Sequence, residues 1–190
     1  MTTVREATAA DHEAVADVVS RAFEDHGETV ADLVDALRAS GHVRAELVSD
    51  TDGAVTGHVM LSRSWVDARQ ALVEVAVLSP LSVAPEHQGS GIGTALLAEA
   101  VEAARGLGVP ALFLEGDPGF YSTRGFVAAT PLGFGRPSER IPEPAFQVVV
   151  LDGHEPWMRG RLVYCDPFWA LDCVGLRDPR LAEVEAALAD

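Results

Sequence analysis

A glycine-rich turn between an apolar strand and an amphipathic helix constrains the fold of this chain more than any other feature of its sequence. The apolar run from Leu72 to Val83 is typical of a buried central strand, although Glu74 interrupts it and Ser79–Pro80 predicts a bulge or kink. Glycines occupy alternate positions of the range 89–93, and an apolar stripe at helical spacing follows. This stripe consists of Ile92, Leu96, Leu97, Ala100, Val101 and Ala104. With a further apolar strand over 111–114, the segment predicts a strand–helix–strand unit with a parallel pair.

Before this unit, the pattern predicts one strand followed by two helices. Residues 3–7 alternate in the manner of a short strand, and Thr8 with Asp11 has the form of a helix start. Two apolar stripes follow at helical spacing, separated by Gly27 and ended by Gly41. The first stripe contains Val15, Val18, Val19, Ala22 and Phe23, and the second contains Val30, Leu33, Val34 and Leu37.

Short strands dominate the rest of the predicted pattern. Residues 43–49 and 54–61 flank an Asp-Gly turn and predict a β-hairpin. Residues 146–151 and 161–164 predict two more strands, and Leu181, Val184 and Leu188 mark a short C-terminal helix. The chain therefore has the pattern of a mixed α/β fold, in the α+β sense. We expect a mostly antiparallel central sheet with one parallel crossover, flanked by helices.

Length and composition exclude several classes of protein. The 190 residues fit one domain, and 48% hydrophobic with 23% charged residues is ordinary for a globular protein. All 14 basic residues are arginine, and the net charge of -15 argues against nucleic-acid binding. No apolar run is long enough for a membrane span, and the first residues lack the apolar block of a signal peptide, so we expect a cytoplasmic protein. Cys165 and Cys173 are too few and too unevenly spaced for a disulfide framework or a zinc site.

The glycine turn has the chemistry of an anion site. The first turn of a helix carries unpaired N–H groups and a partial positive charge, and glycines let the backbone bring those groups against a phosphate. In so acidic a chain, backbone dipoles have to hold a phosphorylated ligand, because side-chain cations are scarce. The P-loop pattern fails because the chain contains no lysine, and the dinucleotide pattern Gly-x-Gly-x-x-Gly fails on spacing. The spacing present is Gln-x-x-Gly-x-Gly, at Gln88, Gly91 and Gly93.

This spacing resembles the acetyl-CoA signature of the GNAT superfamily of N-acetyltransferases. The signature runs Leu-x-Val-x-Pro, then Arg or Gln, then x-x-Gly-x-Gly, then a helix with paired leucines, and residues 81–97 are similar to it. Residues 4–11 resemble the start of these proteins, and Tyr121 followed by Gly125 and Phe126 matches a third element. The resemblance implies a single acetyltransferase domain over 1–190, in which 1–151 carries the signature and 152–190 is an extension.

The resemblance also implies acetyl-CoA as cosubstrate and a position for each of its parts. The backbone of Leu81, Ser82 and Val83 would pair with the pantetheine arm, in a slot that opens where a bulge splays the parallel strands. Gln88 stands where arginine is commoner. Backbone N–H groups of the turn would hold the pyrophosphate; the residues are Gln88, Gly89, Ser90, Gly91, Ile92, Gly93 and Thr94.

Acetyl transfer to an amine requires a base and an acid. A lysine-like amine with a pKa of about 10.4 is almost entirely protonated at pH 7, so a carboxylate has to take its proton. Glu74 is our candidate because it interrupts the apolar strand leading to the glycine turn; the alternative is an ordinary ion pair on the strand's other face. Glu115 and Asp117 are rival bases, and either could instead cap the short helix that follows. Tyr121, which matches the family's tyrosine, is the candidate acid for the leaving thiolate, with a core aromatic as the alternative.

We therefore expect an N-acetyltransferase that moves acetyl from acetyl-CoA to a primary amine by direct transfer in a ternary complex. The alternatives are a non-catalytic acyl-CoA-binding or sensing module on the same fold and a different nucleotide-binding α/β protein. The acceptor is a small-molecule or peptide amine, the net charge favours a cationic one, and residues 133–144 would border its site. Three aromatic side chains of the extension could line that site, form a homodimer contact or simply pack; they are Trp157, Phe168 and Trp169.

Overall fold

The protein divides into two compact units, which we describe separately. The structure is a computed structural model that describes residues 1–175 and residue 186. The first unit contains residues 1–62 and 78–107, and the second contains residues 63–77 together with the chain from 108 onward. Strands β3 (Ala54–Ala68) and β4 (Leu72–Val83) each continue from one unit into the other, so the chain passes between the units within regular structure.

The first unit combines antiparallel strands with three long helices. Strand β2 pairs with β1 on one side and with β3 on the other, and the turn between β2 and β3 places Gly53 at a φ of 88°. The Asp-Gly hairpin predicted from the sequence is therefore confirmed. The other elements of this unit are β1 (Thr2–Glu6), α1 (His12–Ala22), α2 (Gly27–Ser40), β2 (Val43–Thr51) and α3 (Ile92–Gly106), with 3-10 helices at Ala9–Asp11, Glu24–His26 and Pro85–His87.

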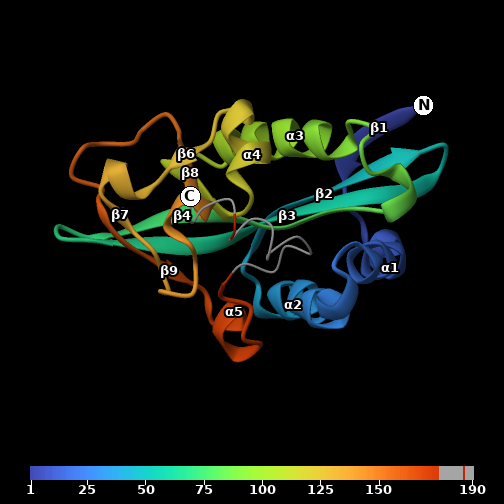
Figure 1. The fold of residues 1–190 in the computed structure, drawn as a ribbon, viewed down its shortest axis with the longest axis horizontal. Helices are drawn as coiled ribbons and strands as arrows, with labels where there is room; N and C mark the ends of the chain where they lie inside the picture. The colour runs from blue at the N-terminus through green and yellow to red at the C-terminus, as the bar shows by residue number, and fades with distance from the viewer. Residues whose placement is uncertain (176–185, 187–190) are drawn as a thin grey trace. The chain divides into compact units, whose positions relative to one another are not determined.

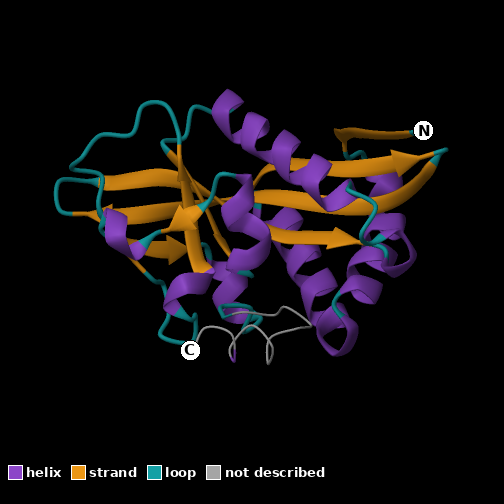
Figure 2. Ribbon diagram, turned by 45° about the horizontal axis from the view of Figure 1, so that its top comes forward, coloured by secondary structure: helices purple, strands orange, loops and turns teal. Residues whose placement is uncertain are grey.

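Helices cover both faces of the strands in the first unit. Figures 1 and 2 show α3 on one face of β1 to β3, and α1 with α2 on the other. A glycine permits the close approach of α3, because a Cβ at Gly57 of β3 would lie 2.9 Å from a methyl of Leu96 and 3.0 Å from one of Ile92. Gly27 allows α1 and α2 to cross closely, since a Cβ there would lie 1.9 Å from the carbonyl oxygen of Ser20. Gly27 thus begins α2 and does not merely separate two helices.

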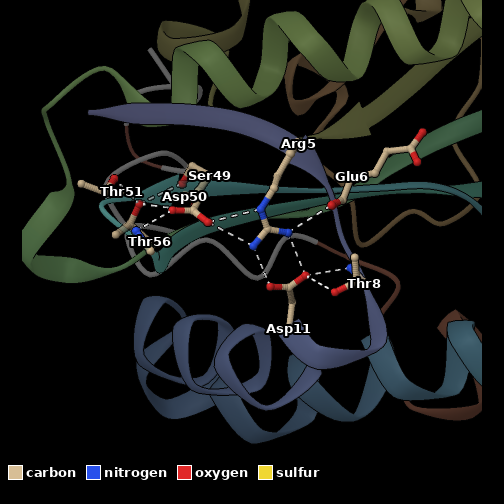
Figure 3. Close-up of polar contacts among 9 residues, drawn as sticks. Arg5, Glu6, Thr8, Asp11, Ser49, Asp50, Thr51 and Thr56 are labelled. Carbon is tan, nitrogen blue, oxygen red and sulfur yellow. Dashed lines mark hydrogen bonds and ion pairs between the residues drawn. The ribbon is translucent and has the colours of Figure 1, made fainter.

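A network around Arg5 ties β1 to β2 and to the start of α1 (Figure 3). The Arg5 guanidinium donates to both carboxylate oxygens of Asp11 at 2.8 Å and to Asp50 at 3.2 Å. Asp11 also accepts from the backbone N–H of Thr8 at 2.8 Å, so the helix start predicted at Thr8 and Asp11 is confirmed. Hydrogen bonds from Arg5 and Thr8 hold the pKa of the Asp11 carboxyl below its ordinary range.

The second unit contains the remaining strands and several short elements. Strand β5 pairs in parallel with β4 at two positions and antiparallel with β8, which also pairs with β6. Strand β9 pairs antiparallel with the end of β3 and in parallel with β7. The elements are β5 (Ala111–Glu115), α4 (Pro118–Tyr121), β6 (Val127–Ala128), β7 (Phe134–Gly135), β8 (Phe146–Val150), β9 (Gly160–Tyr164) and α5 (Asp166–Ala170), with 3-10 helices at Ser122–Arg124, Thr130–Leu132 and Glu143–Ala145.

The two units have different cores. Among the largest fully buried side chains, those of the first unit are all aliphatic, whereas those of the second are mainly phenylalanine. Within the second unit the Phe113 ring stacks on Phe146 at 5.7 Å and meets Phe134 edge-on at 4.9 Å. In the first unit the buried set is Leu33, Leu37, Met60, Leu61, Leu96 and Leu97, and in the second it is Leu112, Phe113, Phe126, Phe134, Phe146 and Phe168.

The mixed, mostly antiparallel architecture with the β4–β5 parallel pair agrees with the predicted fold class. The parallel pairing of β7 with β9 was not predicted, because strands as short as two residues leave no periodic signal. Strand β3 runs to Ala68, beyond the predicted end at Leu61, because β9 pairs with its last residues. The peptide bond Ser79–Pro80 is cis, and the bulge expected there stays a prediction. The predicted C-terminal helix around Val184 lies outside the described residues.

Among the residues that the structure describes, no helix is both long enough and apolar enough to cross a membrane.

Candidate functional site

The glycine turn of the first unit is an exposed loop that ends at the first turn of α3. Gly89 and Gly91 have φ of 74° and 92°, a conformation that residues with a side chain rarely adopt. A Cβ built at either position meets nothing within 4 Å, so open space lies beside this backbone. Gly91 is the N-cap of α3, and within the described residues no side chain caps this helix start. The turn therefore presents helix N–H groups to an open, exposed space, which fits an anionic group such as a pyrophosphate.

Side chains of the turn hold its own backbone in place. The exposed Gln88 amide donates to the carbonyl oxygen of Val83, the last residue of β4, at 3.2 Å. The Ser90 hydroxyl donates to the carbonyl oxygen of His87, and the N–H of Ala84 donates to Thr56 of β3 at 2.9 Å. Gln88 thus holds the turn against β4 through a neutral hydrogen bond. An arginine, which is commoner at this position, would instead bring a positive charge.

The strand that leads into the turn has one buried hydroxyl. Ser82 is 2% exposed, and its hydroxyl oxygen has no hydrogen-bond partner in the described part of the chain. Leu81 and Val83 on either side are half-buried. Nothing in these positions tests the predicted backbone pairing with a pantetheine arm, which stays a prediction.

In the second unit, Glu74 of β4 forms an ion pair with Arg63 of β3. Their closest atoms, Oε2 and Nη2, are 2.7 Å apart, and each side chain is 38% exposed. The Arg63 guanidinium also lies 5.2 Å from the ring centroid of Trp65. Glu74 therefore has the ion pair that the sequence offered as the alternative to a base, and its catalytic role stays untested.

Glu115, at the end of β5, is held from two other segments of the same unit. The Tyr164 hydroxyl, on β9, donates to Oε1 of Glu115 at 2.7 Å, and the N–H of Gly175 donates to Oε2 at 3.1 Å. Tyr164 is 3% exposed, and burial together with the Glu115 carboxylate raises the pKa of its hydroxyl well above the ordinary value. Tyr164 therefore stays protonated and acts as the donor.

Asp117 and Tyr121 follow Glu115 within one short stretch. Asp117 is the N-cap of α4, where its carboxylate accepts from the N–H of Gly119 at 2.8 Å, so the capping alternative applies to it. The Tyr121 ring lies against Gly116, since a Cβ there would be 2.3 Å from its Cε2 atom. Gly116 is itself fixed, because its N–H donates to Ala145 at 3.0 Å and its carbonyl accepts from the buried Gln147 amide at 3.1 Å.

The register of the second unit separates the two glutamates by face. Val77 of β4 lies opposite Phe113 of β5 in the parallel pair. Because side chains alternate along a strand, Glu115 shares the face of Phe113 and Val77, whereas Glu74 points to the other face. Asp117 and Tyr121 follow Glu115 in sequence, but the Tyr121 ring lies where a Gly116 side chain would be, and Gly116, the neighbour of Glu115, faces the opposite side from it.

Sequence reasoning missed Tyr164 altogether. It ends a short strand with little alternation, and it meets Glu115 across 49 residues, so neither spacing nor periodicity marks it. Both cysteines are buried, and burial raises the pKa of Cys165 to about 11. Phe126 is 1% exposed and belongs to the core, and Phe168 is also buried while Trp169 is exposed. In the described part of the chain, no three metal-binding side chains gather in a way that could hold an ion.

Comparisons with known proteins agree with this geometry. The model of the acetyltransferase (GNAT) family matches residues 12–134. The "Uncharacterized N-acetyltransferase YjhQ" of Escherichia coli (strain K12) is 31% identical over 114 residues, covering 59% of this chain and 62% of that protein. The chain therefore spans less than two thirds of the length of this curated relative.

Two solved structures share most of the fold. A GNAT family N-acetyltransferase (YhbS) from Escherichia coli, in complex with CoA, has a TM-score of 0.77 at 28% identity, over 88% of this chain and 91% of that one. A GNAT family acetyltransferase from Brucella melitensis, in complex with acetyl-CoA, has a TM-score of 0.73 at 28% identity, over 88% of this chain and 98% of that one. The family match includes the glycine turn and Tyr121, and well over half of the chain. This chain belongs to the acetyltransferase (GNAT) family.

Proposed function

We propose that this protein transfers the acetyl group of acetyl-CoA to a primary amine by direct attack in a ternary complex. The observation that carries the proposal is the exposed start of α3, with Gly89 and Gly91 in left-handed conformations. Solved relatives in complex with CoA and acetyl-CoA support the choice of ligand. We also propose that the two units act as one acetyltransferase domain, since the family match at 12–134 draws on residues of both.

Backbone groups of the first unit would hold acetyl-CoA, which supplies the acetyl group as a thioester. The N–H groups of residues 88–94 would bind its pyrophosphate, and the strand backbone of Leu81, Ser82 and Val83 would pair with the pantetheine arm. Gln88 would contribute by keeping the turn against β4 through its bond to Val83. Backbone binding matters here because side-chain cations are scarce in a chain of net charge -15.

Two protons have to be moved. A carboxylate takes the proton of the acceptor ammonium, whose pKa of about 10.4 otherwise keeps it unreactive at pH 7. Glu74 is the base that the sequence favours and Glu115 its rival. Tyr121 would donate a proton to the departing thiolate. A covalent route through Cys165 is disfavoured, because its pKa of about 11 keeps it a thiol at neutral pH.

The acceptor would be a small-molecule or peptide amine. The net charge of -15 favours a cationic acceptor, attracted over long range. Its kcat/KM should then fall with rising ionic strength, and a rise would contradict the proposal.

Release of CoA thiol from acetyl-CoA, measured across a panel of primary amines, tests the function. We expect turnover with at least one amine, and a fall of about 10²-fold or more in kcat for Tyr121→Phe, typical of losing a general acid. Calorimetry should show CoA affinity unchanged in that variant. Tight CoA binding without turnover of any amine would establish a binding or sensing module instead, and no thermal stabilisation by millimolar CoA would point to a different nucleotide-binding protein.

The activity of Glu74→Gln, compared with that of wild type, tests the role of Glu74. If Glu74 is the base, Glu74→Gln should abolish most activity. Equal activity of Glu74→Gln and wild type would leave Glu74 as a structural ion pair.

A further inference from the structure

An ion pair joins helix α1 to the segment that leads into the glycine turn. Arg21, in the last turn of α1, donates from Nη2 to Oε2 of Glu86, which lies in the 3-10 helix Pro85–His87. Nη1 of the same guanidinium donates to Asp17, one turn earlier in α1, at 2.9 Å. The pair therefore links the helix on one face of the strands to the residues just before α3, which lies on the other face (Figures 1 and 2).

Glu86 lies beside the backbone that would hold the pyrophosphate of CoA. It precedes Gly89 by three residues, so their Cα atoms are at most about 11 Å apart. The turn also folds back on this 3-10 helix, because the Ser90 hydroxyl donates to the carbonyl oxygen of His87, the residue after Glu86. At an ionic strength of 0.01 M the Debye length is about 30 Å, so a charge on Glu86 then acts on the whole turn.

An uncompensated carboxylate at Glu86 would oppose the binding of a polyanion. The Arg21 guanidinium holds the pKa of the Glu86 carboxyl below its ordinary value, so the group is ionised at neutral pH. The side chains are 42% and 55% exposed, so the pair contributes little to folding. Its effect on a nearby phosphate does not depend on that contribution, because the two charges cancel only while Arg21 is present.

The first unit is strongly acidic, which makes this compensation important. It contains three times as many acidic residues as arginines. Arg5 is bonded to Asp11, and Arg38 is bonded to Glu46, in other parts of the unit. Neither of these two arginines is available to compensate Glu86.

We infer that Arg21 is a determinant of CoA affinity that α1 contributes to the proposed site. Its guanidinium cancels the charge of Glu86 beside the turn, so the N–H groups of the turn receive the pyrophosphate without a fixed negative charge next to them. The inference rests on the proposed function, because its ligand is the CoA of that proposal. The cancellation acts through space and requires no contact between Arg21 and CoA.

Calorimetric titration with CoA at an ionic strength of about 0.01 M tests the inference. Arg21→Gln should raise the Kd about threefold, the factor expected in water for one uncompensated charge and the two charges of a pyrophosphate about 11 Å away. Glu86→Gln should lower the Kd by a similar factor, and the double variant should bind like wild type. At about 1 M salt, where the Debye length is about 3 Å, these differences should disappear.

Arg105→Gln is the matched control. It removes the same charge from another exposed ion pair of the first unit, with Glu102 at 3.4 Å. Arg105 follows Ile92 by thirteen residues of α3, which is about 20 Å along the helix. Its loss should therefore leave the Kd within about 1.5-fold of wild type.

The signs of the two single substitutions separate the possible outcomes. Equal Kd values for Arg21→Gln and Arg105→Gln would overturn the inference and leave the proposed function standing. Weaker binding by both Arg21→Gln and Glu86→Gln would also overturn it, because the ion pair would then act only by holding the turn in place. Failure of the wild type to bind CoA would overturn the inference and the proposed function together.

Discussion

The two compact units differ in what is buried and in how each would contribute to the reaction. The first unit has an aliphatic core and buries charged groups as a network, in which Arg38 and Glu46 form an ion pair and His58 lies 3.0 Å from Glu46. The second unit has a phenylalanine core, and a part-buried hydrogen bond in it joins Tyr164 to Glu115.

The candidate binding groups belong to the first unit, and most of the candidate catalytic groups belong to the second. In the first unit the candidate site is made of backbone: N–H groups at the start of α3 and two glycines in left-handed conformations. In the second unit the candidate groups are side chains whose positions depend on tertiary contacts, such as Tyr121 on Gly116. Changes of side chain should therefore be tolerated better in the turn than around β5.

The largest expected effect lies in the aromatic core. Phe113→Ala should destabilise the protein by about 3–5 kcal/mol, because it removes a fully buried ring that contacts Phe134 and Phe146. Leu96→Ala, in the aliphatic core of the first unit, should cost about 2–5 kcal/mol. Urea unfolding measures both, and because β3 and β4 belong to both units we expect one transition. Two separate transitions would show that the units unfold independently.

The buried histidine of the first unit gives the next largest effect. Burial lowers the pKa of His58, so below about pH 6.5 the unfolded chain binds a proton that the folded chain does not. Stability should therefore fall as pH decreases, by up to about 1.4 kcal/mol per pH unit. Above about pH 6.5 His58 is neutral in both the folded and the unfolded chain, so the free energy of unfolding loses nothing through it. Glu46, whose pKa is about 2 because bonds from His58 and Arg38 outweigh the effect of burial, adds a loss only below its ordinary pKa.

Free energies of unfolding between pH 5 and 7 measure this slope. His58→Gln can still donate to Glu46 but does not titrate, so its slope should be flatter than that of wild type whatever its absolute stability. His12→Gln is the control, because His12 is exposed on α1 and water reaches its ring in both states. Parallel slopes for wild type and His58→Gln would show that His58 does not contribute.

Local features of the sequence predicted the fold of the first unit well. The stripes of α1, α2 and α3 and the Asp-Gly turn each involve residues only a few positions apart, and such spacing determines backbone conformation directly. The glycine turn is also a local feature, because Gly89 and Gly91 are themselves the residues that adopt its left-handed conformation. Its position and its suitability for an anion were therefore predictable.

The candidate side chains of the second unit were predictable only in part. Glu74 could be named because it interrupts an apolar strand, and Tyr121 because it matches the family's tyrosine. Glu115 and Asp117 could be named from their place after a strand, but the partners of these residues could not be predicted. Arg63 meets Glu74 through the pairing of strands, and Tyr164 meets Glu115 through the packing of β9. Contacts between distant residues depend on register and on side-chain volume, which no local pattern encodes.

A substitution of Gly91 tests whether the glycine turn binds CoA through its backbone. Gly91→Ala should weaken CoA binding about tenfold, because a residue with a side chain is strained by about 1–2 kcal/mol at a φ of 92° and the turn would relax away from its binding conformation. Gly53→Ala is the matched control: it carries the same strain at a φ of 88°, in the β2–β3 hairpin, with open space around it. It should lower stability similarly and leave the calorimetric Kd for CoA unchanged. Equal Kd values in the two variants would contradict a role for the turn.

The smallest expected effect is that of the Gln88 side chain on the Kd for CoA. Gln88→Ala removes an exposed hydrogen bond of 3.2 Å to Val83, worth about 0.5–1.5 kcal/mol at most, so the Kd for CoA should rise by less than about tenfold and by less than in Gly91→Ala. Gln88→Arg loses the same bond but adds a cation, so its affinity should exceed that of Gln88→Ala and depend more steeply on salt. If Gln88→Ala instead bound CoA more weakly than Gly91→Ala, the side chain and not the backbone would hold the phosphate. The first unit would then resemble the second, with binding as well as chemistry dependent on particular side chains.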